Sequence, residues 1–154
     1  MAGYFFDASA IVKRYLIEVG TLWVGGLVSP SAGNRIYVAR ISGAEVVAAI
    51  SRRGKAGALA PATVIGSIAQ FRLDFTGQYL HVPVSSSVVR KAMDLAEKHA
   101  LRGYDAVQLA CALAANARRL SKGALPLALI SADVELNVAA AVEGMSVDDP
   151  NHHP

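Results

Sequence analysis

The chain has 154 residues, of which 53% are hydrophobic and only 18% are charged. This composition excludes a disordered chain and predicts one domain over residues 1–150, followed by a short tail at 151–154. The formal net charge of +3 permits nucleic acid as a partner without requiring it. No apolar run is long enough to span a membrane, and Cys111 has no second cysteine to pair with, so we expect a soluble cytoplasmic protein.

Apolar segments that end at polar residues alternate with helical patterns along the chain. The apolar segments predict buried strands at 4–6, 36–39, 79–82 and 127–130, with an edge strand at 145–147. Helices are expected between them, at 8–16, 22–28, 42–50, 61–75, 88–99, 104–120 and 134–142. Thr21 is predicted to cap the second helix, and Ser42 with Glu45 has the spacing of a capping box. Strands alternating with helices indicate an α/β sandwich around a mostly parallel sheet.

Four acidic residues fall where an expected strand gives way to a helix, or in the first turn of a helix. They are Asp7, Glu45, Asp105 and Asp133. Because the carboxyl ends of parallel strands meet at one edge of a sheet, we expect these side chains to gather there. Each has apolar neighbours in the sequence, and buried carboxylates need a partner or a metal ion. Hard oxygen ligands suit Mg²⁺, or Mn²⁺ in its place.

Two of these acids also have a purely structural interpretation. Glu45 could serve as the capping-box partner of Ser42, and Asp133 could cap the helix that follows it. Glu135 lies two residues past Asp133 and could replace it as a ligand. The sequence leaves open which of the two faces the site.

Four stretches of the chain together resemble the PIN domain, and specifically the toxin ribonucleases of VapC type. The opening stretch runs from Tyr4 to Tyr15 and contains Asp7-Ala8-Ser9-Ala10. The others are 42–45, 99–110 and 131–136, and they occur in the order that the family has. The segment around Asp105 is the most specific of the four.

The resemblance implies a three-layer α/β/α fold and a magnesium-dependent endoribonuclease that hydrolyses RNA. It also implies a toxin that a cognate antitoxin holds inactive and that forms a homodimer. The four acidic positions of the family's motif, which are catalytic and metal-binding, are matched by Asp7, Glu45, Asp105 and Asp133. Ser9 matches a small hydroxyl residue that could orient Asp7 or simply begin the helix. Gln108 stands where relatives often carry His and is not expected to be a ligand.

Three basic residues are candidates for contact with RNA phosphates: Arg102, Lys13 and Arg14. Ordinary helix C-terminal or solubilising charge explains Lys13 and Arg14 better than RNA contact does, whereas Arg102 lies next to the most specific motif. The RNA target cannot be read from the sequence. The alternative function is a catalytically silent PIN-like module that binds RNA or a protein. A phosphotransferase of the haloacid dehalogenase type is disfavoured, because that family has a second Asp where this chain has Ser9.

Overall fold

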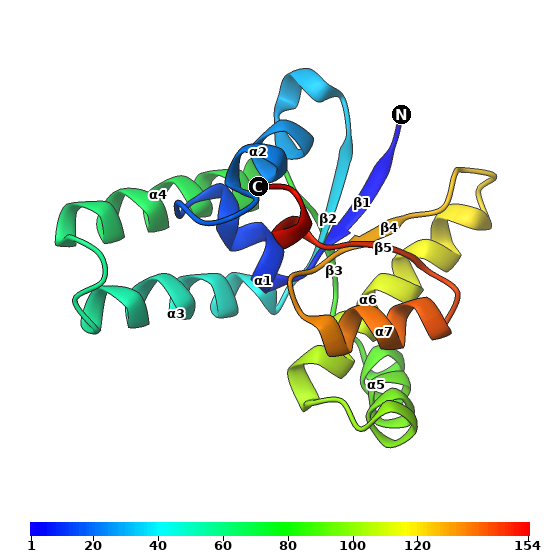
Figure 1. Ribbon diagram of the computed structural model, residues 1–154. Helices are drawn as coiled ribbons and strands as arrows, with labels where there is room; N and C mark the ends of the chain where they lie inside the picture. Colours follow the sequence, from blue (N-terminus) through cyan, green and yellow to red (C-terminus); the bar gives the residue numbers. More distant parts are fainter.

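A five-stranded sheet with helices on both faces forms the protein, seen in a computed structural model of residues 1–154 (Figure 1). The strands are β1 (Gly3–Phe6), β2 (Arg35–Ala39), β3 (Leu80–Val82), β4 (Ala128–Ile130) and β5 (Ser146–Asp148). Their spatial order is β3-β2-β1-β4-β5. Every neighbouring pair is parallel, which confirms the α/β prediction and makes the sheet wholly rather than mostly parallel.

The helices follow the predicted positions, with shifts of a few residues at their ends. In chain order they are α1 (Ala8–Ile11), α2 (Thr21–Val28), α3 (Ser42–Lys55), α4 (Pro61–Gly77), α5 (Ser86–His99), α6 (Gly103–Leu120) and α7 (Val134–Val142). The first predicted helix is shorter than expected, because α1 tightens into a 3₁₀ turn over Val12–Arg14. None of the helices is long and apolar enough to cross a membrane.

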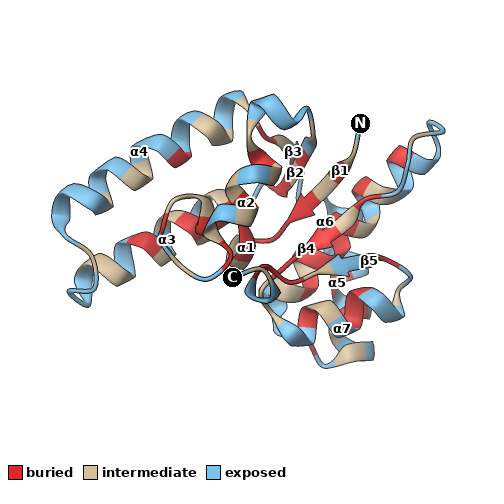
Figure 2. Cartoon of the chain, turned by 45° about the horizontal axis from the view of Figure 1, so that its top comes forward, coloured by how far each residue is buried: buried red, intermediate tan, exposed pale blue.

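Side chains alternate across the sheet and divide the core into two layers. Phe5 faces one layer, where it packs with α5, α6 and α7. Phe6 faces the other, where it packs with α1, α2, α3 and α4. Both phenylalanines are fully buried. Figure 2 shows buried residues in β1, β2 and β4, whereas the edge strand β5 is mostly exposed. Because β1 is central and covered on both sides, the three-layer arrangement fixes its carboxyl end inside the protein.

The two predicted helix caps are wrong, since both side chains are used elsewhere. Gly20, in the left-handed conformation, precedes α2, and the hydroxyl of Thr21 instead donates to Leu16 O and accepts from Glu18 N. Ser42 lies inside the first turn of α3 and caps nothing. Its buried hydroxyl faces α6.

Two of the last four residues, which we expected to be a tail, contact the N-terminal half of the chain. Asn151 Oδ1 accepts a hydrogen bond of 3.0 Å from Lys13 Nζ. The imidazole of His153 stacks on the ring of Trp23, with centroids 4.0 Å apart. Such contacts cannot be inferred from the polar composition of the segment. Figure 1 shows the C-terminus beside α1 and α2.

The turn at Gly20 depends on glycine for two reasons, which generates a first prediction. Its φ is 86°, and a Cβ there would lie 2.3 Å from the backbone oxygen of Pro150. We expect Gly20→Ala to lower the free energy of unfolding by about 1–3 kcal/mol. Gly26→Ala is the matched control, because a Cβ at that position in α2 meets nothing within 4 Å. Urea unfolding measures both variants, and Gly26→Ala should leave the free energy of unfolding unchanged or raise it by about 1 kcal/mol. Equal changes in the free energy of unfolding for the two variants would contradict the prediction.

Candidate functional site

The four acidic residues singled out in the sequence line one cavity of about 770 Å³ at the carboxyl edge of the sheet. Asp7 follows the central strand β1, and Asp133 follows its neighbour β4. Glu45 lies in the first turn of α3, shortly after β2, on the other side of β1. Asp105 lies in the first turn of α6. The direction of strand order reverses between β1 and β4, where parallel sheets place their ligand crevice.

Asp7 is only 3% exposed, and its carboxylate is held by hydrogen bonds rather than by a cation. It caps α1 by accepting from Ala10 N at 2.9 Å. Ser9 Oγ lies 2.7 Å and 2.9 Å from its two oxygens, and Ser131 Oγ donates at 2.8 Å. Burial nevertheless raises the pKa of Asp7 from an ordinary 3.8 to about 7, against the opposing effect of these hydrogen bonds. The site therefore contains a carboxyl group close to its titration point at neutral pH.

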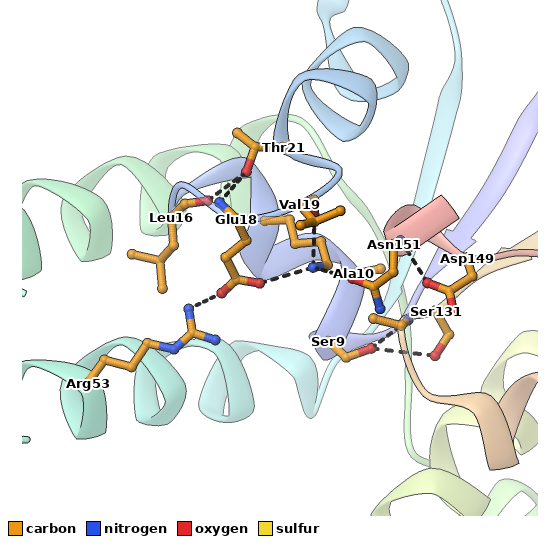
Figure 3. Close-up of polar contacts among 12 residues, drawn as sticks. Ser9, Ala10, Leu16, Glu18, Val19, Thr21, Arg53, Ser131, Asp149 and Asn151 are labelled. Carbon is orange, nitrogen blue, oxygen red and sulfur yellow. Dashed lines mark hydrogen bonds and ion pairs between the residues drawn. The ribbon is translucent and has the colours of Figure 1, made fainter. Parts of the chain in front are cut away.

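Ser131 is a member of this site that the sequence analysis did not single out. Besides donating to Asp7, its hydroxyl accepts from Asp133 N at 3.0 Å. Ser9 Oγ accepts from Ala132 N at 2.9 Å and lies 3.4 Å from Ser131 Oγ (Figure 3). The two hydroxyls thus connect the ends of β1 and β4. Only the position of Ser131 directly after a buried strand could have indicated it.

Glu45 is held by Gln108 of α6, and the capping box does not form. Gln108 Nε2 donates to Glu45 Oε1 at 3.0 Å and to Ser42 Oγ at 2.9 Å. Burial raises the pKa of Glu45, and Asp105 adds to the increase through its charge. Gln108 is buried, and its Oε1 has no hydrogen-bond partner. The residue that we did not expect as a ligand therefore positions one of the four acids.

Arg102 joins the remaining two acids. Its Nε donates to Asp105 Oδ2 at 3.0 Å, and its second amino group donates to Asp133 Oδ2 at 2.9 Å. Asp133 also caps α7, because Oδ1 accepts from Leu136 N at 3.0 Å. Burial and the charge of Asp133 raise the pKa of Asp105. Of the two alternatives, Asp133 lines the cavity, whereas Glu135 is exposed and does not line it.

The acids share a cavity, but their carboxylates are not gathered into a metal-binding cluster. No three Asp, Glu, His or Cys side chains lie close enough to hold an ion as they stand. The available donors are carboxylate and hydroxyl oxygens, which fit a hard cation such as Mg²⁺. Binding one requires side chains to move. Arg102 is 75% exposed, so it can swing away from Asp105 and Asp133 at little cost.

Two of the three basic residues proposed to contact RNA line the cavity, namely Arg102 and Lys13. Lys13 is buried and pairs with Glu18 at 3.0 Å, so its charge is already balanced. Glu18 also pairs with Arg53, which lines the same cavity (Figure 3). Arg14 lies outside the cavity.

Solved toxin–antitoxin structures resemble this chain over nearly its full length. A chain of a toxin–antitoxin complex from Klebsiella pneumoniae aligns with a TM-score of 0.63 and 16% identity, over 96% of this chain and 97% of that one. VapBC2 from Rickettsia felis, bound to a DNA fragment from its promoter, aligns with a TM-score of 0.61 and 12% identity, over 96% of this chain and 98% of that one. FitAcB from Neisseria gonorrhoeae aligns with a TM-score of 0.58 and 17% identity, over 97% of this chain and 99% of that one. Neither a protein-family model nor a curated protein matches the sequence. At these identities the likeness establishes the fold, which is the PIN-like fold that we expected.

The raised pKa of Asp7 predicts how stability depends on pH when a chelator removes divalent cations. Because the folded state favours the neutral carboxyl, its contribution to stability is complete below about pH 4 and is lost as pH rises to about 7. Asp7→Asn cannot ionise, so above pH 7 it should unfold with a free energy up to about 4 kcal/mol higher than the unmodified protein. In acid the two should be nearly equally stable.

Urea unfolding in EDTA, between about pH 5 and pH 8, measures this difference. The matched control is Asp94→Asn, which removes an exposed acid from α5. The free energy of unfolding of Asp94→Asn should differ from that of the unmodified protein by the same amount at every pH in this range. A difference for Asp7→Asn that is independent of pH would show that Asp7 is not strained by ionisation.

Proposed function

We propose that the protein is a metal-dependent endoribonuclease that hydrolyses RNA phosphodiesters at the acidic cavity. The observation that carries this proposal is the placement of Asp7, Glu45, Asp105 and Asp133 on the walls of one cavity at the sheet edge. These acids come from four separate parts of the sequence. Their buried or half-buried carboxylates have raised pKa values at three positions, and a divalent cation would relieve that strain.

Asp7, Glu45, Asp105 and Asp133 would hold the ion, which we propose to be Mg²⁺, with Mn²⁺ as a substitute. When bound, such an ion makes coordinated water more acidic and offsets negative charge at a phosphodiester. The chain's own residues prepare the site. Ser9 and Ser131 orient the carboxylate of Asp7 by hydrogen bonds.

The cationic side chains around the cavity fit a substrate that carries phosphates. Arg52, Arg53 and Arg102 all line the cavity; Arg52 and Arg102 are exposed and Arg53 is partly exposed. Once Arg102 leaves its carboxylate partners, its planar guanidinium can form paired hydrogen bonds to a phosphate. We propose that these arginines bind the RNA backbone beside the acids. Such contacts give affinity without reading the base sequence.

Removing one acid tests the proposed activity. Asp7→Asn and Asp105→Asn should each lower RNA cleavage in Mg²⁺ by about a hundredfold or more, because an amide is a weaker ligand than a carboxylate. Mg²⁺ should raise the melting temperature of the unmodified protein and of Asp94→Asn, but not that of either site variant. Cleavage is measured on labelled RNA with Mg²⁺ or with EDTA. Full cleavage by Asp105→Asn would overturn the proposal.

The second candidate function, a catalytically silent module that binds RNA or a protein, makes the opposite prediction. It would bind its partner equally well in EDTA and yield no products from any RNA. The missing three-residue metal cluster in the present side-chain arrangement favours this alternative. The shared cavity and the raised pKa values favour the nuclease. The same assay, with RNA binding measured in parallel, separates the two.

We further propose that the protein is the toxin of a toxin–antitoxin pair and acts as a homodimer. The full-length likeness to a chain of the toxin–antitoxin complex from Klebsiella pneumoniae supports the first part of this proposal. The homodimer is proposed from the family resemblance of the sequence. The cognate antitoxin would then be encoded beside the protein's gene.

Expression in bacterial cells tests the toxin assignment. The unmodified protein should arrest growth, and Asp105→Asn should not, because it lacks the proposed metal-binding carboxylate. Co-expression of the neighbouring small reading frame should restore growth and give a complex that survives size-exclusion chromatography. Sedimentation of the purified toxin should give the mass of a dimer. Growth arrest by Asp105→Asn, or a neighbour that neither binds nor protects, would contradict the assignment.

A further inference from the structure

A second cavity, of about 560 Å³, lies at the far end of α6 from the acidic site. It is bounded by the second half of α6, the edge strand β3 and its neighbour β2, and the start of α5. Asp105 and Arg119, one at each cavity, lie 14 positions apart on α6, which corresponds to about 21 Å along the helix. The two cavities have no lining residue in common.

The charge of this cavity is entirely positive. Four cationic side chains line it and no Asp or Glu does; the cations are Arg35, Arg118, Arg119 and Lys122. None of the four takes part in a salt bridge anywhere in the structure. Arg35, Arg118 and Lys122 are exposed at the rim. The protein as a whole carries only three more positive than negative charges, so this concentration is local.

Arg119 is the strongest sign that the cavity is built to receive an anion. It is only 8% exposed, although buried arginines are rare unless they are paired. Its Nε donates to Leu125 O at 2.9 Å, and one amino group lies 3.4 Å from the hydroxyl of Tyr37. The guanidinium also lies over the Tyr37 ring, 5.8 Å from its centroid. These neutral groups orient the guanidinium, but no carboxylate compensates its charge.

Gly3 provides the room that Arg119 occupies. A Cβ at this position would lie 2.9 Å from Cζ of Arg119 and 2.8 Å from Leu127 Cδ2. Any larger residue at the start of β1 would therefore push the guanidinium away from its present position. The buried charge thus depends on a specific backbone position in the central strand.

The remaining wall suits the uncharged part of a small molecule. It is formed by side chains from β3, the loop that follows it and the start of α5, namely Leu80, Val82, Pro83 and Val88. The N-terminus of α5 also reaches the rim, where Ser85 and Ser87 line the cavity. A helix N-terminus of this length favours negative charge, as do the four cations. The volume is in the range of small-molecule sites.

We propose that this cavity binds a nucleotide, with the phosphates on the cationic rim and the base and sugar on the apolar wall. The side chains that line the cavity argue against a binding track for single-stranded RNA. Such tracks use aromatic side chains as stacking platforms, and both aromatic rings here already have a partner. Tyr37 lies beneath Arg119, and the imidazole of His81 lies against the ring of Phe75. The site does not depend on the nuclease proposal, because it contains none of the four acids.

Calorimetric titration of the full-length protein in EDTA tests the proposal apart from any metal-dependent binding. ATP should bind with one site per chain, inorganic triphosphate should bind more weakly, and adenosine should not bind detectably. The double variant R118Q/K122Q removes two exposed rim cations and leaves buried Arg119 in place. It should weaken ATP binding by about tenfold or more, because it removes charge-assisted hydrogen bonds to phosphate.

R90Q/K91Q is the matched control, since it removes the same charge from exposed positions on α5 that do not line the cavity. Its affinity for ATP should stay within about twofold of the unmodified protein. The proposal is overturned if neither ATP nor triphosphate binds, or if both double variants weaken binding equally. It is also overturned if an RNA of about ten nucleotides binds through Arg118 and Lys122 while ATP does not.

Discussion

The arrangement of the sheet edge depends on the buried carboxyl group of Asp7. It ends the central strand β1, caps α1 through Ala10 N, and receives a hydrogen bond from Ser131 at the end of β4. Three elements are therefore tied together at one side chain that no cation neutralises. The same burial that makes this connection rigid raises the pKa of the carboxyl to about 7. Stability and chemistry make opposite demands here, as is common where a fold contains a functional site.

Of the other three acids, Glu45 is held in place by a buried side chain, whereas Asp105 and Asp133 are paired with an exposed one. Glu45 is held by Gln108, a buried neutral residue that also donates to Ser42. Asp105 and Asp133 are instead held by Arg102, whose side chain is mostly exposed. One wall of the cavity is thus preorganised, while the other can exchange its arginine for a ligand. The single positive charge of Arg102 lies between two carboxylates that would otherwise repel each other, and it offsets part of their negative charge.

The edge of the sheet was predictable from the sequence, but the hydrogen bonds that shape it were not. Apolar runs ending at acids placed Asp7 at a strand end, because parallel strands terminate along a common edge. Its partner Ser131 lies 124 residues away, and Gln108 lies 63 residues from Glu45. Local spacing even misassigned Ser42 as a cap, since a capping pattern takes no account of a donor arriving from another helix. Contacts between distant segments are absent from any local pattern.

The helix α6 reaches both cavities, and the charged residues at its two ends have opposite signs. Its N-terminal turn contains Asp105 and its last turn contains Arg118 and Arg119, so each charge complements the helix dipole. That effect alone would explain arginines at a solvated helix end. It does not explain why the Arg119 guanidinium is buried, nor why Arg35 and Lys122 join it from outside the helix. The dipole accounts for neither the burial nor the additional cations, whereas an anionic ligand accounts for both, which is why the cavity is better understood as a binding site than as a helix terminus.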